Sequence, residues 1–224
     1  MTDLDAALSE LKRRGSATLV VGSIPHDAYV RVSRRMLGTD AAARRRLLVV
    51  PESDCEAAVD RLRNAGSTDP ERAQVVACDG TSRSAAAGAA CDAGSPRVRR
   101  VDGSLDELGA AITAWIDHLE ARAGGFSPAE LRVGVDPVPP LKCGSSRTFG
   151  FLHVLAEQVR RLDGMAHVRV PRDRTDEAVL TLEPLFDAVL ELRLDGYRLE
   201  QRWHLPDHGV VSDWMALPDR ADGG

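Results

Sequence analysis

The sequence predicts an α/β protein, with a mainly parallel β-sheet, helices on both faces and an antiparallel hairpin at the C-terminal end. Short, continuously apolar runs alternate with amphipathic segments, which is typical of parallel strands buried on both faces. Two strand-like runs near the C-terminus flank the turn-forming dipeptide Asp195-Gly196. The chain of 224 residues is long enough to bury a full core without disulfide bonds.

Helix and strand alternate through the first half of the chain. The expected elements are helices over 2–14, 26–37 and 53–66 and buried strands over 17–22, 46–50 and 73–78. Thr2 can cap the first helix and Gly15 can end it. Gly38 can end the second. Ser53 and Glu56 have the spacing of a capping box for the third.

The second half begins with a small, polar stretch over 81–96 that indicates a loop or linker. Ser104 and Glu107 predict a capping box before a long helix. The remaining expected elements are strands over 98–101, 131–136 and 165–170, helices over 147–162 and 176–182, hairpin strands over 189–194 and 197–203, and a final strand over 210–217. We predict one domain over 1–217 and a polar tail over 218–224.

Composition excludes several classes of protein. There are 29 basic and 34 acidic residues, a formal net charge of −5 and 4% aromatic residues, so nucleic-acid binding is not expected. The cysteines form no C-x-x-C pair, which argues against a zinc ribbon or redox dithiol. The first residues are charged and the apolar run over 17–25 is short, so we expect no signal peptide, no membrane contact and a cytoplasmic protein.

Five local motifs carry a family resemblance: "LVVGSIPHDA", "LLVVPES", "LRVGVDPV", "LFDAVLELR" and "EQRWHLP". On these motifs and on the order of its elements, the chain resembles the RecA/KaiC-like ATPase core. The form it resembles is the degenerate one found in a haloarchaeal family of unknown function sometimes labelled HTR-like. The resemblance covers roughly residues 17–217.

The resemblance implies a phosphate loop, G-x-x-x-x-G-K-[ST], after the first strand. Gly22 opens the corresponding segment, and Ser23 and His26 lie within it. Three residues replace the pattern: Asp27 stands for the second glycine, Ala28 for the lysine and Tyr29 for the serine or threonine. Because the lysine and the metal-holding hydroxyl are absent, we expect no ATP hydrolysis in the usual mode.

The resemblance also marks two acidic residues at strand ends. Asp136 stands where the family places the Mg²⁺-associated acid, and Glu52 stands where KaiC-like enzymes place catalytic glutamates. Structural roles remain open for both residues: Glu52 in a turn, and Asp136 as a cap for the following Pro-rich loop. The candidate site, a vestigial nucleotide site, comprises Gly22, Ser23, His26, Asp27, Glu52 and Asp136.

Two other groups of residues were weighed as metal or redox sites. His204 and His208 flank Asp207 in a segment with Pro206, which predicts a turn rather than a zinc helix. Cys55, Cys78 and Cys143 each fall near a strand end, where buried packing is the common role of an isolated cysteine. We expect no metal and no cofactor.

Three functions remain open. The first is a non-catalytic RecA/KaiC-like regulatory or signalling protein that acts through a protein partner or self-association. The second is a sensor that binds nucleotide without hydrolysing it, because the loop after Gly22 precedes a helix N-terminus. The third is an enzyme of unrelated chemistry that uses Glu52, Asp136 and His26.

Overall fold

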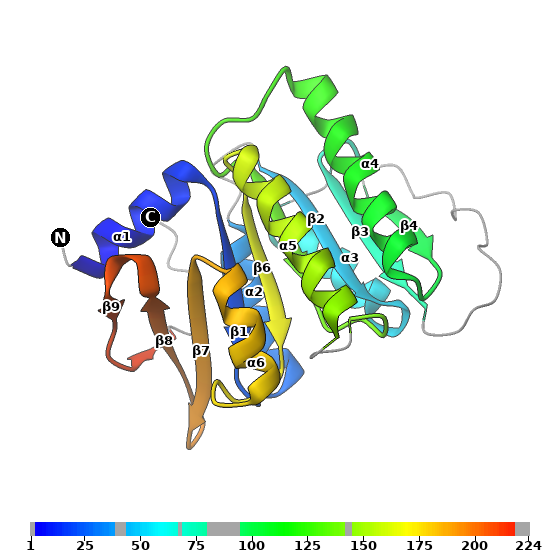
Figure 1. Ribbon diagram of the computed structural model, residues 1–224. Coiled ribbons are helices and arrows are strands. Elements are labelled where there is room, and N and C mark those ends of the chain that lie inside the picture. Colours follow the sequence, from blue (N-terminus) through cyan, green and yellow to red (C-terminus); the bar gives the residue numbers. More distant parts are fainter. Residues whose placement is uncertain (1–2, 39–43, 67–68, 80–94, 142–144, 218–224) are drawn as a thin grey trace.

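The computed structural model describes residues 3–38, 44–66, 69–79, 95–141 and 145–217 (Figure 1). Seven strands in it run parallel. They are β1 (Ser16–Val21), β2 (Arg45–Pro51), β3 (Ala73–Cys78), β4 (Arg97–Val101), β5 (Leu131–Val135), β6 (Met165–Val170) and β7 (Ala188–Asp195). Three antiparallel strands follow: β8 (Arg198–Leu205), β9 (Val210–Val211) and β10 (Met215–Ala216). The predicted α/β fold class is confirmed.

The strands form one sheet in the order β10-β8-β7-β1-β6-β5-β2-β3-β4, with β9 also paired to β8. Three helices, α4 (Leu105–Ala123), α5 (Ser146–Arg161) and α6 (Glu177–Leu182), cover one face (Figure 1). The other face carries α1 (Asp3–Arg14), α2 (His26–Leu37) and α3 (Cys55–Asn64). Among the described residues, none of these helices combines the length and apolarity needed to cross a membrane.

The main core lies beneath α4 and α5. Every second residue of the central strands points into it, for example Leu19 of β1, Val133 of β5 and Val168 of β6. The opposite face of the same strands is mixed, with apolar clusters under α1, α2 and α3 and several buried polar side chains between them. This asymmetry between the two faces positions both sites described below.

Of the two predicted capping boxes, only the Ser104 cap forms, and without the reciprocal bond, since the Glu107 carboxylate accepts from the Asp102 amide and the Ser104 amide donates to Asp102. The Ser104 hydroxyl accepts a hydrogen bond from the Glu107 amide (3.1 Å), as predicted for the start of α4. The Ser53 prediction is wrong: Ser53 lies inside a 3₁₀ turn, Glu52–Asp54, and its hydroxyl contacts Asp54. A residue within that turn lacks the extended backbone of an N-cap, so α3 begins two residues later than predicted, at Cys55.

The C-terminal hairpin is confirmed, with its turn displaced by one residue. Asp195 pairs with Arg198, so the two-residue loop is Gly196-Tyr197 rather than Asp195-Gly196. Gly196 takes the positive φ (59°) that the first loop position of such tight turns uses.

The predicted final strand over 210–217 is interrupted. Val211 pairs with His204 and Met215 pairs with Gln201, so the three residues between Val211 and Met215 face two residues of β8. This is the residue count of a β-bulge, which divides the segment into β9 and β10. The expected loop over 81–96, the cap Thr2, Cys143 and the tail over 218–224 lie wholly or largely outside the described residues.

Candidate functional site

The candidate site is at the carboxyl edge of the parallel sheet, where ligands bind in open α/β folds. Gly22 follows β1 and Asp136 follows β5, and β6 lies between these two strands. Helix α2 begins at His26, shortly after Gly22, and packs against the same region. The structure therefore brings the ends of the predicted loop and the predicted acid to the same edge.

Asp136 is buried, with 1% of its surface exposed. Its Oδ2 accepts a hydrogen bond from Nη2 of Arg61 (3.0 Å), and its Oδ1 accepts one from the Tyr29 hydroxyl (2.8 Å). The Arg61 side chain, which comes from α3, has no exposed surface. Both carboxylate oxygens are thus bound by donors of the protein, and the guanidinium balances the negative charge.

Tyr29, the residue that the family resemblance matches to the serine or threonine of a phosphate loop, is fully buried. Burial, and then the negative charge of Asp136, raise the pKa of Tyr29 well above its ordinary value. The phenol therefore stays protonated and donates to Asp136. The Arg169 guanidinium lies 4.2 Å from the ring centroid, which is the geometry of a cation–π contact.

The hydrogen bonds continue beneath α2. Nη1 of Arg61 donates to the Ser33 hydroxyl (3.2 Å), and Ser33 contacts Nε2 of His167 (3.0 Å). Burial lowers the pKa of His167 to about 4, so the imidazole is neutral near pH 7. We call Tyr29, Ser33, Arg61, Asp136 and His167 the buried polar network.

Gly134 makes room for this network. A Cβ atom on Gly134 would lie 2.8 Å from Cε1 of His167 and 2.6 Å from Cδ2 of Leu48. Both distances are too short for a real side chain, so β5 requires glycine where the imidazole crosses it.

Gly22 has a packing role of its own. Its φ is +121°, and a Cβ atom there would lie 2.1 Å from the Leu192 carbonyl oxygen of β7. The glycine therefore permits β1 and β7 to approach closely. Ser23 is exposed and contacts Asp173 (3.4 Å), and Asp27 is exposed in the first turn of α2.

His26 and the loop before it are held by Arg169. Nη1 of Arg169 lies 3.1 Å from Nδ1 of His26, and Nη2 donates to the carbonyl of Ile24 (3.3 Å). Burial lowers the pKa of Arg169 from its ordinary value, and the nearby Tyr29 and Asp136 oppose this shift. The positively charged side chain of Arg169, on β6, thus lies beside the loop that contains Ile24 and His26.

Glu52 lies apart from this group. It is in the 3₁₀ turn after β2, and its carboxylate accepts a hydrogen bond from Nε of Arg100 (2.8 Å) on β4. Among the described contacts, none joins Glu52 to Asp136 or to His26. The structure groups His26 and Asp136 around Tyr29, places Gly22 against Leu192 of β7, and directs Glu52 toward the β4 edge.

The histidine and cysteine groups do not form metal sites among the described residues. His204 contacts Glu191 (2.9 Å) and His208 contacts Glu10 (3.3 Å), so the two histidines have different partners. Cys55 and Cys78 are buried, and neither forms a disulfide bond among the described residues. Burial, with nearby Asp102, raises the pKa of Cys78 to about 11, which keeps this thiol protonated.

The sequence analysis missed the basic and hydroxyl members of the site: Ser33, Arg61, His167 and Arg169. A signal for two of them exists. In "MAHVRV" the residues His167 and Arg169 alternate with apolar residues, so they share the face that also carries Arg132 and Asp136 of "LRVGVD". Period-two polarity within a strand expected to be buried on both faces indicates a polar interior.

Fold and site together define an α/β protein whose candidate nucleotide edge is closed by an internal ion pair. The chain belongs to a family of unknown function, DUF7504, whose model matches residues 15–192. None of the curated proteins matches it. A KaiC-like protein from the hyperthermophilic archaeon Pyrococcus horikoshii OT3 is similar in structure, at 11% identity and a TM-score of 0.47, covering 86% of this chain and 79% of that chain.

Proposed function

We propose that this chain is a RecA/KaiC-like relative that does not hydrolyse nucleotide and acts as a regulatory or signalling protein through protein contacts. The observation that carries the proposal is the pairing of Asp136. Both of its carboxylate oxygens accept hydrogen bonds from buried protein donors and Arg61 balances its charge, so a metal at this acid would compete with contacts that the protein itself supplies.

The energetic cost of opening this site supports the proposal. Mg²⁺ at Asp136 would lie beside the buried Arg61 guanidinium, and repulsion between the two positive charges would favour displacement of Arg61. Removing the partner of a buried ion pair costs about 3–5 kcal/mol. The loop offers no compensation, because Asp27 and Ala28 stand where a glycine and the phosphate-binding lysine are needed.

An exposed apolar surface supports the protein-contact part. Helices α4 and α5 border a groove of about 450 Å³ that includes Phe151 and Val154. Val154 is 63% exposed and the neighbouring Phe149 is 37% exposed. Exposed apolar side chains beside a groove are typical of interaction surfaces, and this one is our candidate for contact with a protein partner or, in self-association, with a second copy of the chain.

The hydrolysis part is tested by phosphate release from ATP with Mg²⁺ in molar KCl, for the wild-type chain and Asp136→Asn. We expect both proteins to release phosphate at the rate of the buffer alone. Mg²⁺-dependent release by the wild type that Asp136→Asn abolishes would refute the proposal.

The self-association part is tested by light scattering at high protein concentration. We expect a mass above that of one chain, and Val154→Asp should return it to that of one chain. The matched control is Leu180→Asp, which places the same charge on α6 at a side chain of similar exposure (51%). A wild-type mass equal to one chain contradicts this part alone.

The nucleotide-sensor alternative has one observation in its favour. The N-terminus of α2 follows Pro25 and has no side-chain cap, and Arg169 lies beside it. Both features favour an anion. A rise in melting temperature with ATP in the absence of Mg²⁺, lost in Arg169→Gln, would favour this alternative over the first proposal.

A further inference from the structure

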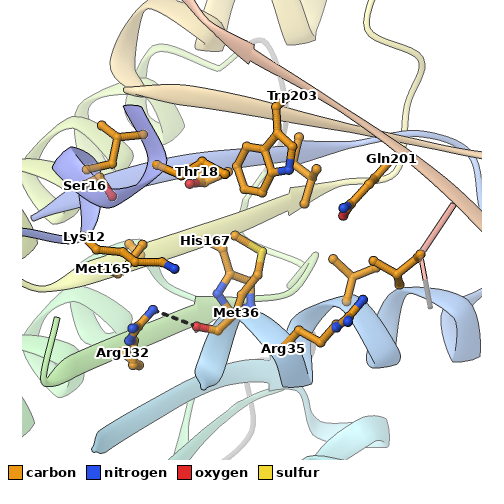
Figure 2. A pocket seen from close by; sticks show the side chains of 16 residues that line it. Lys12, Ser16, Thr18, Arg35, Met36, Arg132, Met165, His167, Gln201 and Trp203 are labelled. Atoms are coloured by element: carbon orange, nitrogen blue, oxygen red, sulfur yellow. Dashed lines mark hydrogen bonds between the residues drawn. The ribbon is translucent and has the colours of Figure 1, made fainter. Parts of the chain in front are cut away.

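A cavity of about 410 Å³, one of whose lining residues is His167 of the buried polar network, lies on the sheet face that α1 and α2 cover (Figure 2). It is bounded by α1, α2 and the amino-terminal ends of the central strands, where Ser16 begins β1 and Met165 begins β6. Its volume lies within the range of small-molecule sites.

The cavity combines apolar walls with an exclusively positive set of charges. The apolar side chains come from α1, α2, three strands and the C-terminal segment: Leu8, Leu11, Val32, Met36, Met165, Leu190, Trp203 and Leu217. The charged lining residues are Lys12, Arg35 and Arg132, and no Asp or Glu is among the lining residues. The whole chain has a net charge of −5, whereas this cavity is lined by three cations and no acid, so it should attract a negatively charged ligand.

Polar side chains point into this cavity from strands that are otherwise buried. Ser16 and Thr18 of β1 line it, as does His167 of β6 (Figure 2). On the other face of the same strands, Leu19 and Val168 belong to the apolar core. Burying polar groups is unfavourable unless they find partners. His167 has one in Ser33, so the group of these three that lacks a partner within the described part of the chain is the Ser16 hydroxyl.

Ser16 gives the most specific indication of a ligand. The residue is fully buried (0% exposed), and its hydroxyl has no hydrogen-bond partner among the described residues. An unpaired buried hydroxyl costs about 1–3 kcal/mol. A ligand atom in the cavity that accepts a hydrogen bond would remove that cost.

Arg132 places a fixed positive charge at the same wall. Its Nε donates to the Ala129 carbonyl (2.9 Å) and its Nη1 donates to the Met36 carbonyl (3.1 Å; Figure 2). Burial and the neighbouring Arg44 and Arg46 lower the pKa of Arg132 to about 9, so it remains charged near pH 7. These two bonds hold the guanidinium in place and leave Nη2 without an acceptor among the described residues.

We propose that this cavity binds a small organic anion with an apolar body, a carboxylate or a phosphate monoester. The anionic group lies against Arg132 and Lys12 and accepts a hydrogen bond from Ser16, and the apolar body packs against Trp203 and Met36. Arg35 adds positive charge at the mouth. Charge sign and apolar lining together exclude a cationic ligand and a bare inorganic ion.

The test is isothermal titration of the full chain with octanoate and octyl phosphate, followed in parallel by tryptophan fluorescence. Octanol supplies the apolar body without charge, octylamine reverses the charge, and inorganic phosphate supplies charge without the body. We expect octanoate or octyl phosphate to bind at least about tenfold more tightly than the three comparison compounds. Tighter binding of octanoate would indicate a carboxylate ligand, and tighter binding of octyl phosphate would indicate a phosphate monoester.

The variants compare charges inside and outside the lining. Lys12→Gln with Arg35→Gln removes the two exposed cations of the cavity, and each such charge contributes up to about fivefold in affinity. The matched control, Arg13→Gln with Arg34→Gln, removes the same charge from adjacent positions of α1 and α2 that do not line the cavity. We expect weaker binding only in the first pair, and Trp203→Phe should remove the fluorescence change.

Three results would overturn the proposal. One is no binding of either anion below millimolar concentration. Another is octanol binding as tightly as octanoate, since the charge would then play no part. The last is equal weakening in both double variants, because net charge rather than the cavity would then account for it. None of these results bears on nucleotide hydrolysis, because none of these measurements uses ATP or changes Asp136.

Discussion

Removal of the Asp136 carboxylate charge tests whether this acid is a structural or a ligand-binding group. In Asp136→Asn, the Arg61 guanidinium stays buried with no carboxylate partner, since both side chains are at most 1% exposed. Breaking a buried pair in this way costs about 3–5 kcal/mol of unfolding free energy. For a chain of this size that corresponds to a fall in melting temperature of about 10 °C.

The measurement is urea unfolding followed by circular dichroism, on a double-mutant cycle of Asp136→Asn and Arg61→Met. We expect each single variant to lose several kcal/mol and the double variant to lose less than the sum, with a coupling of about 2 kcal/mol or more. The control is Asp106→Asn, which breaks the exposed pair with Arg147 (87% and 71% exposed) and should cost less than about 1 kcal/mol.

A gain in unfolding free energy in Asp136→Asn, instead of a loss, would refute the structural role of Asp136. Residues kept for binding commonly reduce stability, so a free Mg²⁺ ligand at position 136 would leave Asp136→Asn neutral or stabilising. A loss below about 1 kcal/mol, or a coupling near zero, would show that the Arg61 contact does not hold this edge closed.

Three further predictions concern single side chains, each measured as unfolding free energy in urea. Tyr29→Phe should lose about 1–3 kcal/mol because Oδ1 of Asp136 loses its donor. Because the pKa of Tyr29 is raised, the stability that the phenol contributes is present below pH 10 and lost above it, so the difference between wild type and Tyr29→Phe should shrink in alkali. A difference that stays constant to pH 11 contradicts the assignment. The pKa of His167 is lowered to about 4 against an ordinary 6.5, so the unfolding free energy should fall by about 3 kcal/mol as the pH drops from 6.5 to 4. His167→Gln should lack this part of the pH dependence. If the unfolding free energy of His167→Gln falls as steeply in acid as that of the wild type, the imidazole is not neutral and buried. Gly22→Ala should lose about 3 kcal/mol or more from positive φ and contact with Leu192, whereas Gly124→Ala, at φ +69° with nothing within 4 Å, should lose about 1 kcal/mol; equal losses would show that the contact with β7 is unimportant.

Most helices and strands could be predicted from local patterns. The strands β3 and β6 have the predicted boundaries, because each is a short run rich in apolar residues between polar or glycine-containing segments. The Ser104 cap is likewise a contact between residues three positions apart. The Ser53 cap failed because a 3₁₀ turn competes for the same residues at the end of β2.

Two of the predicted site residues, Gly22 and Asp136, share one edge of the sheet, and the basic residues around Asp136 were not predicted. The order of strands and helices was enough to place Gly22 and Asp136 together, since carboxyl ends of parallel strands share an edge. The partners of Asp136 were not predictable in this way. Arg61 lies 75 positions and Tyr29 lies 107 positions away along the chain.

The loss of the phosphate-loop pattern can be read directly from the chain, because it depends only on which residues follow Gly22. The closure of the acid by Arg61 depends instead on how α3 and α2 pack over β5. The cavity between α1 and α2 has the same origin, since Lys12, Arg132 and Trp203 come from three elements distant in sequence. Local side-chain patterns select helices and strands, whereas the pairing of buried charges is selected by tertiary packing, which brings distant residues into one low-dielectric interior.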